Sequence, residues 1–113
     1  MSELNITCNQ DITEYELFDN MDLKLNLLKG IFSHGFEKPS PVQKKAIIPI
    51  INGTECIVHA QSGVGKTAVF TIAMLQLIDE SINTIQGIII APTRDLAQQI
   101  NSIILSIGKY LKI

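Results

Sequence analysis

The chain has 113 residues, of which 46% are hydrophobic and 18% charged, and its formal net charge is −2. This size and composition suit one globular unit and exclude an intrinsically disordered chain. The apolar runs at 47–51 and 88–91 are far shorter than the ~20 residues of a membrane span, and the first residues lack the features of a secretory signal. We therefore expect no membrane partner.

Acidic residues gather at the N-terminus. Residues 1–22 hold six of the eleven acidic residues and none of the nine basic ones, which leaves the remainder with a net charge of +4. Residues 1–16 also show no sustained hydrophobic period, so we expect a flexible acidic leader there. Cys8 and Cys56 lie far apart in no metal-like spacing, and we interpret them as reduced thiols in an intracellular protein. The cytoplasm is the expected location, with the nucleus as the alternative.

Two helices are predicted first. Asp22 is placed to cap a helix that Gly35 would end. Ser40 followed by Pro41 is typical of an N-cap with proline at the first helical position, and this second helix should run to Ile48, where Pro49 interrupts it.

Strands and helices alternate in the rest of the chain. Apolar runs at 55–59 and 87–91 predict two buried strands, each followed by a helix, the first over about 65–78 and the second opening at Pro92-Thr93. This order predicts an α/β fold with a parallel sheet, right-handed crossovers and flanking helices.

A glycine-rich loop joins the first of these strands to its helix, with the sequence AQSGVGKT over residues 60–67. Glycines let backbone N–H groups converge on phosphate oxygens, and a helix start directs its own free N–H groups to the same place. Lys66 is the catalytic candidate, since its ammonium would lie beside the β and γ phosphates, and the Thr67 hydroxyl would ligate Mg²⁺. The residues expected to hold the phosphates are Ser62, Gly63, Val64, Gly65, Lys66 and Thr67.

Two upstream side chains suit an adenine base. The Gln43 amide offers a donor and an acceptor that match the N6/N7 edge of adenine, and the Phe36 ring could stack on a base. Taken alone, a surface glutamine and a core phenylalanine are the more ordinary interpretations of these two residues.

The strings GFEKPSPVQ, AQSGVGKTAVF and APTRDLAQQI follow Phe18 in the order found in DEAD-box RNA helicases. From Phe18 to about Tyr110 the chain resembles that family, most closely its translation initiation factor 4A type. The resemblance implies a RecA-like P-loop fold, ATP and Mg²⁺ as cofactors, adenine recognition by Phe36 and Gln43, and sequence-independent contacts to the backbone of single-stranded RNA. It implies translation initiation proteins as partners, with splicing-linked proteins as the alternative. The residues implied in RNA binding are Pro92, Thr93 and Arg94.

Val64 and Asp95 depart modestly from the family pattern, and the D-E-A-D and S-A-T motifs are absent from the sequence. We therefore expect residues 17–113 to be the N-terminal part of a first RecA-like domain that binds nucleotide without hydrolysing it. Two other interpretations stay open: another P-loop enzyme such as a small kinase, and a truncated, non-catalytic binding module.

Overall fold

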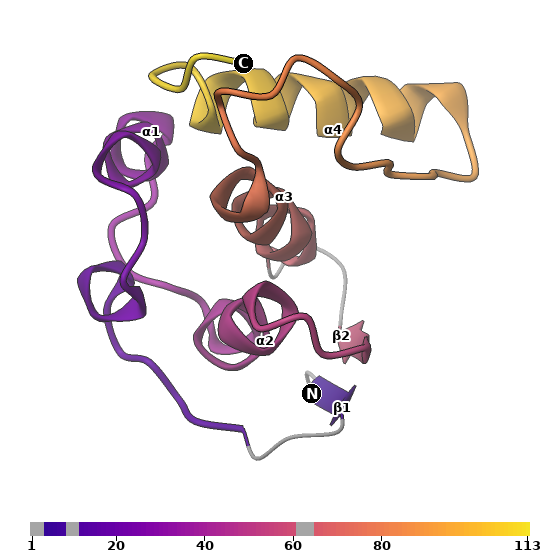
Figure 1. Cartoon of the computed structure of the whole chain (residues 1–113). Coiled ribbons are helices and arrows are strands. Elements are labelled where there is room, and N and C mark those ends of the chain that lie inside the picture. Colours follow the sequence, from indigo (N-terminus) through magenta and orange to yellow (C-terminus); the bar gives the residue numbers. More distant parts are fainter. Residues whose placement is uncertain (1–3, 9–11, 61–64) are drawn as a thin grey trace.

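The computed structural model describes residues 4–8, 12–60 and 65–113. Four α-helices, one 3₁₀ helix and two short strands make up the described part of the chain (Figure 1). In chain order they are β1 (Leu4–Cys8), the 3₁₀ helix η1 (Phe18–Met21), α1 (Leu25–His34), α2 (Pro41–Ile51), β2 (Cys56–Ala60), α3 (Lys66–Leu77) and α4 (Arg94–Ile107).

Helix α3 lies at the centre of the molecule. It packs between α2 and α4, while α1 contacts both α3 and α4, and the β1–β2 pair lies beside α2 (Figure 1). The core forms where these helices meet, and the edge-to-face ring pair of Phe18 and Phe32, with centroids 6.2 Å apart, lies at its margin. The largest fully buried apolar side chains are Phe18, Leu27, Ile31, Ile47, Ile72, Leu75 and Ile107.

Gly30 allows α1 and α4 to approach closely. A Cβ at this position would lie 1.7 Å from the carbonyl oxygen of Ile107 in α4, so that only a hydrogen fits between the two backbones. Glycine in a helix interior costs about 1 kcal/mol relative to alanine. The close packing of α1 on α4 therefore depends on a residue that weakens α1 itself.

The start of α1 differs from the prediction. Asp22 has φ of 56°, in the left-handed region, and closes η1 instead of capping α1, which begins only at Leu25. Lys24 ties this start to the end of α3, because its backbone N–H donates to Gln76 Oε1 at 2.8 Å and its Nζ donates to the carbonyls of Leu75 and Ile78. The predicted end of the helix is confirmed, since Gly35 caps it with φ of 115°.

Helix α2 begins as predicted, with Ser40 as its N-cap and Pro41 at the first helical position. It does not stop at Pro49, which lies inside the helix, and it continues to Ile51. A proline removes the backbone hydrogen bond that its own N–H would donate, and its ring crowds the carbonyl four residues earlier. Because Pro49 falls near the end of α2, the helix tolerates that loss for two further residues.

The sheet of the described residues is antiparallel, whereas we predicted a parallel sheet. β2 forms close to the predicted residues 55–59, but it pairs with β1 in the register Leu4↔Ala60 to Cys8↔Cys56. Residues 87–91 form no strand, and Ile88 and Ile90 are 77% and 91% exposed. A β-branched run becomes a strand only when a neighbouring strand supplies its hydrogen bonds, and no described strand lies beside this run.

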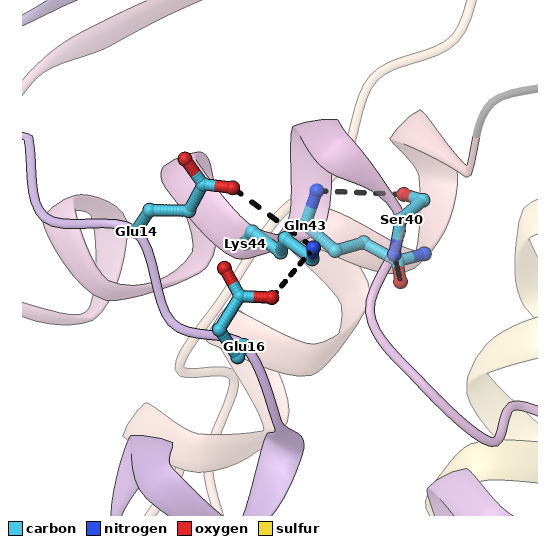
Figure 2. A network of polar contacts seen from close by, with 5 residues as sticks. All are labelled: Glu14, Glu16, Ser40, Gln43 and Lys44. Carbon is cyan, nitrogen blue, oxygen red and sulfur yellow. Dashed lines mark hydrogen bonds and ion pairs between the residues drawn. The ribbon is translucent and has the colours of Figure 1, made fainter.

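The acidic leader is ordered where it meets the rest of the chain. Residues 4–8 form β1, although we expected an irregular segment there. The ammonium of Lys44 in α2 lies 2.9 Å from a carboxylate oxygen of Glu16 and 3.9 Å from one of Glu14 (Figure 2). The hydrogen bond from Lys44 to Glu16 raises the pKa of Lys44. Acidic residues of the leader therefore hold it against α2.

Of the helices in the described ranges, none is both long and apolar enough to cross a membrane.

Candidate nucleotide-binding site

The N-terminus of α3 is the centre of the candidate site. Gly65 precedes the helix with φ of 89°, a left-handed conformation that favours glycine, and no side chain of the described residues caps the helix. The first N–H groups of an α-helix have no partner inside the helix, and they carry the positive end of its dipole. The start of α3 is therefore suited to bind an anion.

Lys66, the first residue of α3, reaches back to the end of β2. Its Nζ donates a hydrogen bond of 2.6 Å to the carbonyl oxygen of Ala60. Ala60 is both the last residue of β2 and the first of the predicted phosphate loop, so the ammonium lies where that loop leaves β2. The loop residues Ser62, Gly63 and Val64 lie outside the described residues. Thr67 follows in the first turn of α3 and is partly exposed.

Gln43 connects α2 to the start of α3. Its side chain is 1% exposed; Oε1 accepts from the Ser40 N–H at 2.9 Å and Nε2 donates to the Gly65 carbonyl at 3.3 Å. The Gln43 N–H in turn donates to Ser40 Oγ at 3.5 Å, which completes a capping box (Figure 2). An amide group has two acceptor lone pairs and two N–H donors. The bonds named here use one lone pair and one N–H of the Gln43 amide, whose side chain is buried.

The contact between Gln43 and Gly65 requires the glycine. A Cβ at position 65 would lie 2.4 Å from Gln43 Nε2 and 3.3 Å from Ser40 Oγ. Together with the positive φ, this close approach restricts position 65 to glycine. The start of the phosphate-binding helix is thus fitted directly against the capping box of α2.

An open cleft of about 1010 Å³ brings several predicted site residues together. Apolar residues of β2, α3, α4 and the 88–91 segment form much of its wall, and ligand sites are commonly apolar clefts with a few polar groups. Gln43 contacts Gly65 from outside this lining, and Thr93 and Arg94 are exposed beside it. The predicted site residues that line the cleft are Phe36, Gly65, Lys66, Thr67 and Pro92.

The predicted RNA-binding residues lie at the start of α4. The helix opens at Pro92-Thr93, as we predicted; Thr93 is its N-cap, and its Oγ1 accepts from the Leu96 N–H at 3.1 Å. The hydroxyl hydrogen of Thr93 and the exposed guanidinium of Arg94 then both lie at the positive end of α4. Hydroxyl, guanidinium and helix N–H groups are all chemically suited to donate to a phosphate.

Sequence reasoning missed the second role of Gln43. We assigned its side chain to a base, yet the structure also makes it the third helical residue of the capping box. The signal was present, because a serine followed three residues later by glutamine is the spacing of that motif. The contact of Lys66 with the Ala60 carbonyl had no such signal, since no sequence motif specifies it.

The family model for DEAD/DEAH box helicases matches residues 40–113. Among curated proteins, the ATP-dependent RNA helicase eIF4A of Mycosarcoma maydis is 54% identical over 101 residues, which are 89% of this chain and 25% of that protein. Eukaryotic initiation factor 4A of Drosophila melanogaster is 52% identical over 99 residues, or 88% of this chain and 25% of that protein. The chain thus spans about a quarter of the length of these relatives.

Solved structures agree with the sequence relatives. Saccharomyces cerevisiae Dbp5 bound to RNA and ADP BeF3 matches with a TM-score of 0.78 and 34% identity, over 88% of this chain and 26% of that chain. A DEAD box protein from the hyperthermophile Methanococcus jannaschii matches with a TM-score of 0.72 and 37% identity, over 88% and 26%. These likenesses support the predicted α/β, RecA-like class. The chain belongs to the DEAD/DEAH box helicase family.

Proposed function

We propose that this chain is the ATP-binding portion of an ATP-dependent RNA helicase that resembles initiation factor 4A. In this proposal the chain binds the nucleotide without hydrolysing it. It supplies the phosphate-binding helix and the base-recognition residues, whereas the D-E-A-D sequence is absent from its 113 residues.

One observation carries the proposal. The Nε2 of Gln43, the residue assigned to adenine, donates to the carbonyl of Gly65 at the start of the phosphate-binding helix, 22 residues further along the chain. Residues assigned to the base and to the phosphates on sequence grounds are therefore in direct contact. Another P-loop enzyme would need the loop but not this glutamine, so the contact favours the helicase interpretation over a small kinase.

The residues present fit a nucleoside triphosphate with its metal ion. The uncapped start of α3 offers N–H donors, Lys66 offers an ammonium, and the close fit of Gly65 against Gln43 leaves room for backbone only. Lys66 would leave the Ala60 carbonyl to meet the β and γ phosphates, and Thr67 would ligate Mg²⁺ through its hydroxyl. Bound Mg²⁺ would neutralise phosphate charge.

In the base pocket, Gln43 would use its remaining donor and acceptor on adenine while Phe36 stacks from the cleft wall. Pro92, Thr93 and Arg94 would meet the backbone of single-stranded RNA, which carries no base information and so gives binding without sequence preference. Translation initiation proteins are the proposed partners and the cytoplasm the proposed location. Splicing-linked proteins and the nucleus are the alternatives.

The base assignment is tested by replacing Gln43. Gln43→Glu keeps an acceptor for the Ser40 N–H, so the capping box survives, but it removes the N–H donors of the amide. Loss of one partner from a buried hydrogen bond costs about 1–3 kcal/mol, so the affinity for ATP should fall by roughly 10-fold or more; the affinity for GTP should fall less, because it loses only the support of the Gln43–Gly65 contact. Isothermal titration calorimetry with ATP, ADP and GTP measures both affinities.

Gln43→Ala is a second variant that also removes half of the capping box and so can lower stability. Its thermal unfolding should therefore be measured together with its nucleotide affinity. Lys45→Ala, a change in the same helix, is the control that should leave both affinities unaltered. Equal affinities of the unchanged chain for ATP and GTP would contradict the adenine assignment.

The RNA assignment is tested by Arg94→Ala in an intact helicase that carries this segment. If the guanidinium meets a phosphate, RNA binding should weaken by a similar factor for unrelated sequences, and the salt dependence of the binding constant should fall by about one ion. Fluorescence anisotropy with two unrelated single-stranded RNAs over a range of salt concentrations measures both quantities. A loss confined to one of the two RNAs would instead indicate base recognition.

A further inference from the structure

The two cysteines, far apart in the sequence, are direct neighbours in the sheet. Cys8 ends β1, Cys56 begins β2, and the antiparallel register places their Cα atoms opposite each other. Side chains of directly opposed residues lie on the same face of the sheet, with Cβ atoms about 4.5–5.5 Å apart. Disulfides join Cα atoms that are usually 4.4–6.8 Å apart, a range that includes both kinds of opposed pair in antiparallel sheets.

The two thiols also contact each other. Burial raises the pKa of the Cys56 thiol, and a hydrogen bond with the Cys8 side chain raises it further. Both residues are thiols and both are partly exposed, so a small reagent can reach them from the solvent. Their position at the end of the two-stranded ladder lets the backbones close by the small amount that a disulfide needs, because only one side of the pair is held by further ladder residues.

We propose that Cys8 and Cys56 form a reversible disulfide that fastens the N-terminal strand to the strand leading into the phosphate loop. The oxidant is a low-molecular-weight disulfide. The thiolate of Cys8 attacks one sulfur of that disulfide and releases one small thiolate; the thiolate of Cys56 then attacks the Cys8 sulfur and releases the second. The protein loses two protons and two electrons, and the small disulfide is reduced to two thiols.

The covalent link would act on β1 more than on β2. Both strands pack against α2, but β2 lies between α2 and α3 in the chain, whereas β1 has helices of the described residues on its C-terminal side only. In the reduced protein β1 is held by its ladder and its packing alone; in the oxidised protein it cannot leave β2. The closed loop runs from residue 8 to residue 56 and includes η1, α1 and α2, so the link also restricts the unfolded chain.

The test uses the 113-residue chain equilibrated with about 1 mM each of reduced and oxidised glutathione, followed by acid quenching and mass spectrometry. We expect most of the protein to remain monomeric with a mass lower by two hydrogen atoms. Trypsin should then yield peptide 1–24 joined by a disulfide to peptide 46–66. We also expect the oxidised protein to unfold at a temperature roughly 10 °C higher than the reduced one. In urea, the equilibrium constant for forming the Cys8–Cys56 disulfide should be at least about tenfold smaller than in native buffer, because the native register no longer holds the sulfurs together.

The matched control moves one sulfur to the other face of the sheet. Thr7→Cys combined with Cys8→Ser keeps two thiols, but residue 7 lies opposite Ile57, whose side chain is 72% exposed on the outer face. This double variant should form the intramolecular bond at least about tenfold less readily and accumulate mixed disulfides with glutathione instead. The proposal is overturned if the unchanged chain remains a dithiol, accumulates mixed disulfides or dimers, or oxidises equally well in urea and in native buffer.

Discussion

Gly30→Ala is expected to destabilise the protein by about 3 kcal/mol or more, against a gain of about 1 kcal/mol that helix propensity alone would give. The reason is the position that the added methyl group would take, 1.7 Å from the carbonyl oxygen of Ile107. That oxygen belongs to the backbone of α4, so it cannot rotate away as a side chain could, and the two helices must separate. Because Ile107 and Ile31 are both fully buried at this contact, their separation would open the core.

Urea unfolding followed by circular dichroism measures the change in free energy, and a fall in Tm of roughly 15 °C should accompany it. Ser33→Ala is the control: it makes the same kind of change at an exposed position of α1 and should leave stability unaltered or slightly raised. An unaltered or raised stability of the Gly30 variant would mean that α1 and α4 do not pack in this way.

Lys66→Ala should weaken ATP binding by about 100-fold, since hydrogen bonds to charged groups contribute about 1.5–3 kcal/mol each and the ammonium also offsets phosphate charge. Without nucleotide, the ammonium donates to the Ala60 carbonyl at 2.6 Å. Calorimetry with ATP and ADP gives the affinities, and AMP should be affected least because it lacks the β and γ phosphates.

The control for Lys66 is Lys29→Ala, which removes one exposed positive charge from α1 and should not alter nucleotide affinity. Lys66→Arg retains the charge and should recover part of the lost affinity. Thermal unfolding of each variant separates loss of binding from loss of fold. ATP affinity that is the same with lysine and with alanine at position 66 would remove this residue from the site.

Sequence signals predicted the helices best where a cap or a stop is chemically explicit. Ser40 with Pro41, Thr93 and Gly35 each marked a helix end that the structure confirms. For α3, the apolar period could not single out one inward face. The helix is apolar around most of its circumference, and Leu77 is 56% exposed although it is a large apolar residue.

The sheet could not be predicted from local pattern. Whether residues 87–91 become a strand depends on a neighbour, and the pairing of β1 with β2 joins segments about 50 residues apart in the sequence. In the site, the residue types and order predicted the chemistry, and the structure brings Gln43, Gly65 and Lys66 together. The binding roles of all these site residues stay predictions, as do those of Ser62, Gly63 and Val64 in the loop and of Pro92, Thr93 and Arg94 at the start of α4.

The bonds of Lys24 have a mechanical consequence. Lys66 begins α3, while Lys24 grips the carbonyls of Leu75 and Ile78 at the opposite end. A helix of 12 residues is a stiff rod about 18 Å long, so a tilt of about 5° at one end displaces the other by about 1.6 Å. A displacement of that size exceeds the range of hydrogen-bond lengths, so it would have to be taken up by the flexible Lys24 side chain or by the start of α1. Lys24 thus connects the start of α1 to the phosphate end of α3 through the length of one helix.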